Sequence, residues 1–252
     1  MSNFSWGILG PGGIAQAFAK DLSFIEGHTI GAVGSRTISN AQKFASTFGG
    51  TAYGSYEELV ADSTIDAIYV ATPHPAHHDN VILALNAGKP VLCEKPFAVN
   101  AKQAQAMVDT AAKNQVALME AMWTRFLPTM DAVFEVINSG LIGTPNFVFG
   151  DHSQYLPIEK APRLWNREQG GGAHYDLGIY PVSFAIRVLG FPDSVSGKSV
   201  MTDTGVDAAT AAVMHYNNGS LAVINSCMTM AGTVSAAVHG TKGRLELDGS
   251  FY

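Results

Sequence analysis

The chain has 252 residues, of which 47% are hydrophobic and 14% charged, and its formal net charge is −6. This length and apolar content fit a protein with one or two sizeable cores, and two domains are the better expectation. The negative charge argues against nucleic acid or an anionic membrane surface as a partner, because both attract basic patches, so a small-molecule substrate is favoured.

The first half of the chain alternates between short apolar runs and longer helical periods. This pattern predicts a parallel sheet with crossover helices, a doubly wound (Rossmann) α/β domain over residues 1–122. The expected strands are WGILG, TIGAVGS, AIYVAT, PVLCEKP and VALMEAM. The expected helices, several followed by the Gly or Asn typical of a helix end, are GIAQAFAKDLSFI, SNAQKFASTFG, SYEELVAD, HHDNVILALNAG and NAKQAQAMVDTAAKN.

The pattern changes after residue 122, and residues 123–252 are predicted to form an α+β domain with a mainly antiparallel open sheet. We expect a helix from about Pro128 to Asn138, the strand TPNFVFGDHS, and a helix that ends near Leu189. AATAAVMHY and SLAVINSCMTM flank Asn-Asn-Gly, which is a strong hairpin signal. TVSAAVHGTKGRLELDG adds another strand pair around a glycine turn.

Two features bear on the compartment. The chain has two cysteines, Cys93 and Cys227, and so few in a chain of this length favour a reducing compartment, with both thiols buried. The N-terminal MSNFSWGILG has no basic segment before an apolar run, and no apolar stretch approaches the roughly 20 residues needed to cross a bilayer. We therefore expect a cytoplasmic protein.

The segment GILGPGGIAQAF follows a predicted strand and opens a predicted helix. Glycines in that place allow a tight turn and let the backbone approach a pyrophosphate, which the helix N-terminus attracts. An ordinary turn is the alternative for the bare pattern, but its placement at the start of the chain favours dinucleotide binding. The predicted contacts are Gly10, Gly12, Gly13, Ile14 and Ala15.

The end of the second strand indicates which dinucleotide is bound. NAD-binding chains usually have a carboxylate there for the adenosine ribose, whereas AVGSRTISN has Ser35, Arg36 and Thr37. A guanidinium with neighbouring hydroxyls suits a 2′-phosphate, because it donates charge-assisted hydrogen bonds. NADP(H) is therefore favoured over NAD, and a solvated loop arginine is the alternative.

Asp176 and Tyr180 stand four residues apart in GGGAHYDLGIYPV, where a helical pattern follows three glycines. On a helix this spacing puts both side chains on one face, about one turn apart. A core tyrosine and a helix-start carboxylate are the alternative reading. Lys95, in CEKPF, ends a predicted parallel strand at the edge where open α/β sheets bind ligands, although lysines at strand ends are usually just solvated.

Together, the glycine loop, ATPHPAHHDNVILALNAGKPVLCEKPFAVN from Ala71 and the glycine-rich approach to Tyr180 resemble the glucose–fructose oxidoreductase/inositol dehydrogenase (Gfo/Idh/MocA) family along the whole chain. Many members of that family have a histidine at the position of Tyr180. The tyrosine, with HPAH from His74 and EAMWTRFLP from Glu120, resembles the branch of dimeric dihydrodiol dehydrogenases and NADP-dependent D-xylose dehydrogenases.

The resemblance implies hydride transfer between NADP(H) and a small polyhydroxylated substrate, such as an aldopyranose or a trans-dihydrodiol. A deoxy-keto sugar reductase, or a catalytically silent NADP-binding sensor or partner protein, are the alternatives. Tyr180 is the expected proton donor and acceptor, and the charge of Lys95 would favour the phenolate form of Tyr180. Asp176 would accept a hydrogen bond from a substrate hydroxyl, or keep Lys95 charged and oriented.

The same motifs supply further expected cofactor residues, and His77 is expected to order its loop. A metal site in PHPAHHDN is disfavoured, because His77 and His78 are adjacent and lack partners at zinc-like spacing. A merely structural histidine at a helix start is the other reading. The predicted cofactor-side residues are Thr72, Pro73, His74, His77, Glu94, Lys95 and Pro96.

MWTRFLP and APRLWNREQ supply aromatic and arginine side chains for a substrate. Aromatic faces pack against sugar or arene rings, and arginines donate to ring hydroxyls. Ordinary interdomain packing is the alternative for each residue. The predicted substrate residues, with Arg163 the strongest candidate, are Trp123, Arg125, Phe126, Arg163 and Trp165.

Two expectations concern the C-terminal half. Members of the family usually continue for several tens of residues after the strand near GRLELDG, so the second domain is expected to be shortened, and an unpaired sheet edge would favour association. AATAAVMHY, SLAVINSCMTM and TVSAAVHG have small or apolar residues on both alternating faces, and nothing in the chain is left to cover one of them. We expect a homodimer through this open face, as the resemblance also implies.

Overall fold

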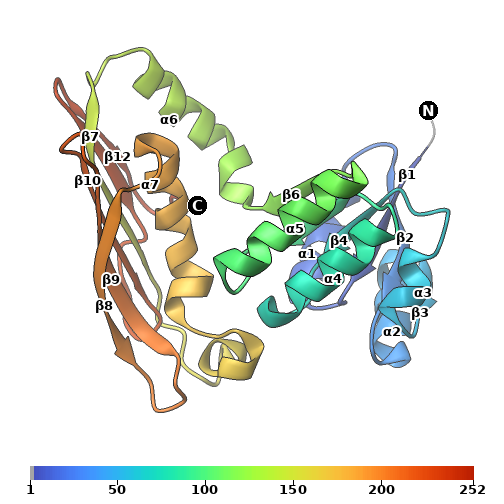
Figure 1. Ribbon diagram of the computed structural model, residues 1–252. Helices are drawn as coiled ribbons and strands as arrows, with labels where there is room; N and C mark the ends of the chain where they lie inside the picture. The colour runs from blue at the N-terminus through green and yellow to red at the C-terminus, as the bar shows by residue number, and fades with distance from the viewer. Residues whose placement is uncertain (1–2) are drawn as a thin grey trace. The chain divides into compact units, whose positions relative to one another are not determined.

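The computed structural model describes residues 3–252. Contacts within the chain divide it into two units, Met1–Ala121 and Met122–Tyr252, each with its own six-stranded sheet (Figure 1). Among residues 3–252, no helix is both long enough and apolar enough to span a bilayer.

The sheet of the first unit has only parallel strand pairs, in the order β3-β2-β1-β4-β5-β6. The order reverses direction between β1 and β4, which is the mark of a doubly wound sheet, and it confirms the predicted Rossmann fold. Such a sheet places its ligand sites at the C-terminal ends of its strands. The strands are β1 (Phe4–Leu9), β2 (His28–Gly34), β3 (Thr51–Tyr53), β4 (Ala67–Val70), β5 (Val91–Glu94) and β6 (Leu118–Ala121).

Helices cover both faces of this sheet (Figure 1). Ile8 and Leu9 are neighbours on β1, and because alternate side chains of a strand point to opposite faces, they lie in different cores. Ile8 packs with α1 and α2, and Leu9 with α3, α4 and α5. These helices are α1 (Gly13–Leu22), α2 (Ile38–Phe48), α3 (Tyr56–Val60), α4 (His77–Asn86) and α5 (Ala101–Asn114), with a 3₁₀ turn η1 (His74–Ala76) before α4.

The second unit has a mixed sheet in the order β12-β11-β7-β10-β9-β8. β7 and β10 are parallel, and the other neighbouring pairs are antiparallel, which confirms the predicted second fold. The predicted hairpin is formed by β9 and β10. The strands are β7 (Pro145–Ser153), β8 (Ser194–Met201), β9 (Asp207–His215), β10 (Leu221–Cys227), β11 (Ala236–Gly240) and β12 (Arg244–Leu247).

One face of this second sheet is covered and the other is bare. Val148 and Ile224 pack with Phe184 of α7 in the main core of the unit. Figure 1 shows α7 along that face, and no helix of residues 3–252 on the other. The helical segments are α6 (Pro128–Asn138), as predicted, α7 (Ile179–Leu189), the 3₁₀ turns η2 (Trp123–Phe126), η3 (Pro162–Trp165) and η4 (Arg167–Gln169), and a π-helical turn η5 (His174–Gly178).

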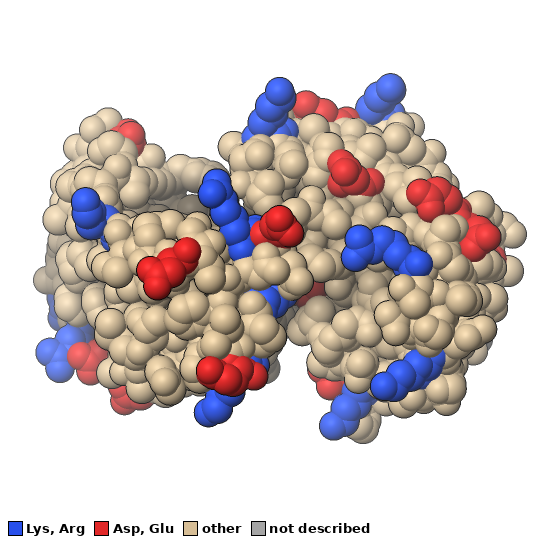
Figure 2. Space-filling model, turned by 90° about the horizontal axis from the view of Figure 1, so that it is seen from below, with Lys and Arg blue, Asp and Glu red and all other residues tan. Residues whose placement is uncertain are grey.

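Charged side chains are dispersed over the face of the molecule that Figure 2 draws. On the face of the described residues drawn in Figure 2, Lys and Arg are interspersed with Asp and Glu, and most of the area is neither. This distribution agrees with the net charge of −6 and differs from the basic stripe that marks nucleic-acid-binding proteins.

Asp151 on β7 joins three segments of the second unit. Its buried carboxylate accepts hydrogen bonds from Ser153 Oγ at 2.6 Å, from Asn225 Nδ2 of β10 at 2.7 Å and from the backbone N–H of Val234 at 3.1 Å. Burial raises the pKa of Asp151, but these donors outweigh it and hold the pKa below its usual value. The ionised carboxylate therefore stabilises the β7–β10 pair and the loop after β10.

We predict that Asp151→Asn lowers the free energy of unfolding by about 1–3 kcal/mol at pH 7, because an amide cannot accept all of these bonds. A carboxylate with a lowered folded-state pKa stabilises the protein above its unfolded pKa of about 3.9, and this contribution is lost as the pH falls through the folded value. Urea unfolding of both proteins should show a difference that shrinks below about pH 4. A difference that is constant between pH 7 and pH 3 would contradict this role.

Candidate functional site

The loop between β1 and α1 has the backbone that a dinucleotide pyrophosphate requires. Gly10 has a φ of 93°, and a Cβ there would lie 3.0 Å from the Thr72 side chain and 3.1 Å from the Ala71 carbonyl oxygen. Gly12 and Gly13 face open space, with nothing within 4 Å of an added Cβ. The first turn of α1 has neither a side-chain cap nor an acidic residue. These features fit an anion bound by the helix N-terminus.

The other two residues predicted from this motif lie differently. Ile14 is exposed, with 50% of its surface accessible, whereas Ala15 is fully buried in the core between α1 and the sheet. A small residue at this third motif position allows the helix to pack closely on the strand.

The segment after β2 ends in an exposed arginine. Ser35 Oγ accepts a hydrogen bond from the Thr37 N–H at 3.2 Å, and Thr37 is the residue before α2. Arg36 lies near the Tyr56 phenol, where burial raises the pKa of Tyr56 and the guanidinium opposes that rise. Arg36 is therefore exposed just after the C-terminal end of β2, whereas Ser35 beside it is buried.

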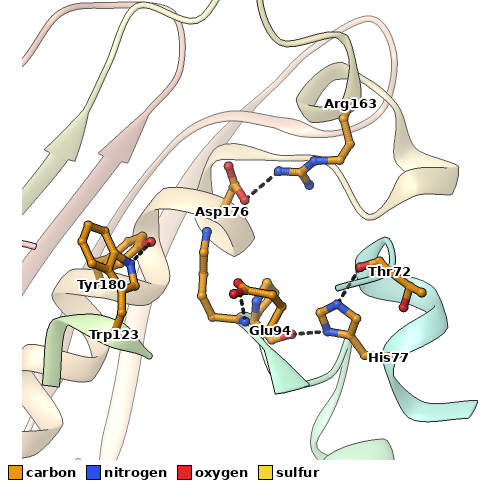
Figure 3. Close-up of polar contacts among 9 residues, drawn as sticks. Thr72, His77, Glu94, Trp123, Arg163, Asp176 and Tyr180 are labelled. Atoms are coloured by element: carbon orange, nitrogen blue, oxygen red, sulfur yellow. Dashed lines mark hydrogen bonds and ion pairs between the residues drawn. The ribbon is translucent and has the colours of Figure 1, made fainter. Parts of the chain in front are cut away.

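His77 connects the loops that follow β4 and β5 (Figure 3). Its ring is fully buried, with Nε2 2.8 Å from the Thr72 carbonyl oxygen and Nδ1 2.9 Å from the Pro96 carbonyl oxygen. Carbonyl oxygens only accept, so the ring donates through a nitrogen that carries a proton. Asn80 Nδ2 adds a bond to Thr72 Oγ1 at 3.0 Å, and the buried His74 ring lies 5.6 Å from that of His77.

Two carboxylates hold the CEKPF segment. Glu94 accepts from the backbone N–H of Lys95 at 3.2 Å and from the Tyr69 hydroxyl, and Glu120 accepts from the Phe97 N–H at 3.0 Å. Burial, with Glu94 beside it, raises the pKa of Tyr69, so Tyr69 stays a neutral donor. Lys95 therefore begins a segment whose backbone is fixed at the C-terminal end of β5.

In the second unit, Tyr180 lies at the start of α7 with 5% of its surface exposed. Its hydroxyl oxygen accepts a hydrogen bond from Trp123 Nε1 at 2.9 Å, as Figure 3 shows. The rings of His152 and Tyr252 pack against it at centroid distances of 5.0 and 4.7 Å. The phenol is thus held in an aromatic setting with its oxygen oriented by an indole.

The turn before α7 is wider than the predicted regular helix. His174–Gly178 forms a π-helical turn, so Asp176 and Tyr180 are less than one full turn apart. The backbone N–H of His174 donates to Asp207 Oδ2 at 2.8 Å, which anchors the start of the turn. A Cβ on Gly178 would lie 2.6 Å from His174 Nδ1 and 3.0 Å from Ser226 Oγ, so this packing requires glycine. π-Helical turns are frequent at functional sites.

Asp176 forms an ion pair with Arg163 at 2.8 Å (Figure 3). The Asp176 side chain is 15% exposed and that of Arg163 is 36% exposed. A largely buried carboxylate thus orients a partly exposed guanidinium. The ion pair with Arg163 was not predicted, because Asp176 was expected to act on a substrate hydroxyl or on Lys95.

The remaining predicted substrate residues have other surroundings. Arg125 Nε donates to Ser183 Oγ of α7 at 3.1 Å, and Phe126 is 64% exposed. Trp165 Nε1 donates to the Leu156 carbonyl oxygen at 2.9 Å, and its ring packs on the small core of Leu164 and Leu177.

Three residues near Tyr180 were not identified from the sequence. His152 stacks on Tyr252 at 4.2 Å, and Gln154 Nε2 lies 2.9 Å from His152 Nε2 and 2.6 Å from the Tyr252 hydroxyl. His152 lies on β7 and Tyr252 is 72 residues beyond Tyr180 in the chain, so no local spacing joins them. The polar residues His152 and Gln154, at and just after the end of the apolar strand β7, were the sequence signal that could have identified this site.

Comparison with known proteins agrees with both halves of this geometry. Residues 4–122 match the family model described as an oxidoreductase family with an NAD-binding Rossmann fold, and residues 130–246 match the Gfo/Idh/MocA C-terminal domain. The chain belongs to the Gfo/Idh/MocA oxidoreductase family. This membership confirms the resemblance inferred from the glycine loop, the CEKPF segment and the approach to Tyr180.

Named relatives within the family act on small hydroxylated molecules. The chain is 38% identical to trans-1,2-dihydrobenzene-1,2-diol dehydrogenase of Xenopus tropicalis, over 96% of this chain and 74% of that protein. It is 36% identical to D-xylose 1-dehydrogenase (NADP(+)) of Hypocrea jecorina, over 96% and 71%.

A solved structure shows the same fold. The 3-ketoreductase of Actinomadura kijaniata in complex with NADP and TDP-benzene matches with a TM-score of 0.89 and 26% identity, over 99% of this chain and 78% of that one.

We predict that His77→Leu lowers the free energy of unfolding of the first unit by about 2–5 kcal/mol, because the buried polar contact that joins two loops is lost. His78→Leu is the matched control, since His78 is partly exposed and pairs with the exposed Asp79, and it should cost less than about 1 kcal/mol. Thermal unfolding of both variants measures the difference. Equal, small effects would show that the His77 bridge does not hold the two loops.

Proposed function

We propose that the protein is an NADP(H)-dependent oxidoreductase that transfers a hydride between nicotinamide and a carbinol or carbonyl carbon of a small polyhydroxylated substrate. The observation that carries the proposal is the Tyr180 phenol, which is buried at the head of α7 with its oxygen oriented by Trp123. An indole only donates, so in this contact the phenol oxygen is the acceptor.

The first unit has the groups to hold the cofactor. The glycine loop and the open N-terminus of α1 suit its pyrophosphate, and Arg36, with no carboxylate beside it in AVGSRTISN, suits its 2′-phosphate. In the proposal the Thr72–Pro73–His74 loop, fixed by His77, borders the nicotinamide. NADP(H) supplies the hydride acceptor or donor, which protein side chains lack.

In the proposed reaction, protein side chains transfer the proton. Removing hydride from a carbinol carbon requires loss of the hydroxyl proton, and Tyr180 is the proposed acid and base. A phenol with an ordinary pKa near 10 is a weak base at neutral pH, so a cation that favours phenolate is needed, and this is the role proposed for Lys95. The Arg163 guanidinium, oriented by Asp176, is proposed to donate to a substrate hydroxyl.

The proposed substrate is a six-membered ring with adjacent hydroxyls, such as an aldopyranose or a trans-dihydrodiol. The names of the two relatives support this class, because one acts on a dihydrobenzene diol and the other on D-xylose. Trp123 is 48% exposed and so offers ring surface for such a molecule to pack on. Reduction of a keto sugar is the second candidate, favoured by the structural similarity to a 3-ketoreductase.

An absorbance assay at 340 nm separates these candidates. Oxidation of D-xylose or a trans-dihydrodiol with NADP⁺ should raise the absorbance, whereas reduction of keto sugars with NADPH should lower it. Tight NADPH binding without turnover of any of them would contradict the proposed enzyme activity.

A cytoplasmic, reducing setting is proposed because both cysteines, Cys93 and Cys227, are free and buried. A homodimer is proposed because the centre of the uncovered face of the second sheet is apolar. Phe149, Val213 and Val223 are cross-strand neighbours on that face and are only half-buried in the single chain.

We predict that Arg36→Ala weakens NADPH binding roughly ten- to a hundredfold while NADH binding changes little, because only NADPH has the 2′-phosphate. Arg36→Lys keeps the charge without the planar fork and should lie between the two proteins. Fluorescence titration with both cofactors measures the effect. An equal loss for NADPH and NADH would overturn the NADP(H) assignment.

We predict a dimer mass in light scattering at micromolar concentration, and a monomer mass for Val223→Glu, because a charge in the centre of the apolar face opposes its burial. Phe24→Glu is the control, since Phe24 is 80% exposed in the first unit and should leave the dimer intact. A monomer mass for the unmodified protein would contradict the proposed assembly.

A further inference from the structure

We propose that Trp123 is a positioning residue for proton transfer, whose indole N–H stabilises the phenolate form of Tyr180. The geometry that points to this role is the 2.9 Å bond from Trp123 Nε1 to the Tyr180 oxygen. The inference deepens the proposed function, and it rests on the acid–base role assigned there to Tyr180.

Trp123 is fastened to the helix that carries Tyr180. Arg125, in the same turn η2, donates from Nε to Ser183 Oγ of α7 at 3.1 Å. Arg187, also on α7, donates from Nη1 to the Arg125 carbonyl oxygen at 3.1 Å, and its guanidinium lies 4.0 Å from the centre of the Phe134 ring of α6. The indole is therefore held against Tyr180 by contacts that do not involve the phenol.

Trp123 is much more exposed than Tyr180, and packing alone does not require the indole N–H to point inward. Tyr180 is 5% exposed, whereas Trp123 is 48% exposed, yet the indole directs its one polar atom inward to the phenol oxygen. The Trp123 ring also meets Tyr180 and Tyr252 edge-on, with interplanar angles of 86° and 85°. One side chain thus orients the acid–base oxygen while leaving part of its ring in solvent.

A donor-only partner favours one charge state of its acceptor. The bond from the indole N–H becomes charge-assisted when the phenol ionises, and such bonds are about twice as strong as neutral ones. His152 and Tyr252 are the titratable groups whose rings contact Tyr180, while Asp176 is paired with Arg163 on the preceding turn. The charge of Arg125 on η2 is directed to Ser183. Removing the indole N–H should therefore raise the midpoint of Tyr180 ionisation, by about one pH unit.

The direct test is a spectroscopic titration of Tyr180 without turnover. The absorbance change near 295 nm on raising the pH is measured for the protein and for Tyr180→Phe, and their difference gives the Tyr180 phenolate. The same difference is then taken in a Trp123→Phe background. We expect the midpoint to move up by about one pH unit. An unchanged or lower midpoint would overturn the inference.

Trp165→Phe is the matched control for this titration. It removes an indole N–H that donates at the same distance, 2.9 Å, to the Leu156 carbonyl oxygen in the same unit. The Tyr180 midpoint should then stay at the wild-type value. A shift as large as that of Trp123→Phe would show that the effect is general to the unit and would also overturn the inference.

The pH profile of turnover links the bond to the chemistry. In the oxidative direction, the acidic limb of kcat/KM for Trp123→Phe should move to higher pH by the same amount, with the rate approaching that of wild type above both midpoints. A merely structural or substrate-packing role would lower the rate by one factor at every pH. Tyr180→Phe separates the two claims: full activity in that variant defeats the proposed function, whereas an inactive Tyr180→Phe with an unshifted Trp123→Phe profile defeats this inference alone.

Discussion

A buried phenol oxygen must be hydrogen-bonded, and in the second unit this constraint falls on Tyr180. Leaving that oxygen without a donor would cost roughly 1–3 kcal/mol, so the arrangement around it is specified closely. Trp123 supplies a donor to that oxygen, and Arg125 and Arg187 hold the η2 turn to α7. The close approach of Pro181 to Gly150 packs α7 on β7. A Cβ on Gly150 would lie 2.7 Å from Pro181 Cβ, so even the strand sequence reflects the position of this helix.

In the first unit, backbone groups near the proposed cofactor site also need hydrogen-bond partners. The loops at the C-terminal ends of its strands keep their shape only when their backbone polar groups have partners. His77 bridges the Thr72 and Pro96 carbonyls, and Glu94 and Glu120 accept the backbone N–H groups of Lys95 and Phe97. The buried His77 ring and two half-buried carboxylates therefore fix the segments that carry the proposed cofactor contacts, while the glycine loop provides the space.

Much of the fold could be predicted because it follows local periodicity. Alternating apolar runs identified the parallel sheet, Asn-Asn-Gly identified the β9–β10 hairpin, and the apolar period identified α6. β8 was not identified, because SVSGKSVM is exposed along its whole length and has no buried face to set a pattern. The π-helical turn was also missed, since it depends on the fit of Gly178 against His174 and Ser226 rather than on any repeat. Side-chain partners from distant segments, such as His152 and Tyr252 beside Tyr180, arise only when the sheet assembles.

The central claim is that Tyr180 transfers a proton, and Tyr180→Phe tests it most directly. Phenylalanine keeps the ring and its contacts with His152 and Tyr252, so circular dichroism should show a folded protein that has lost about 1 kcal/mol of stability with the Trp123 bond. Turnover should fall by about 10²- to 10⁴-fold while NADPH affinity hardly changes, because the phenol acts on the substrate oxygen. A folded variant that keeps more than about a tenth of wild-type turnover would contradict the account.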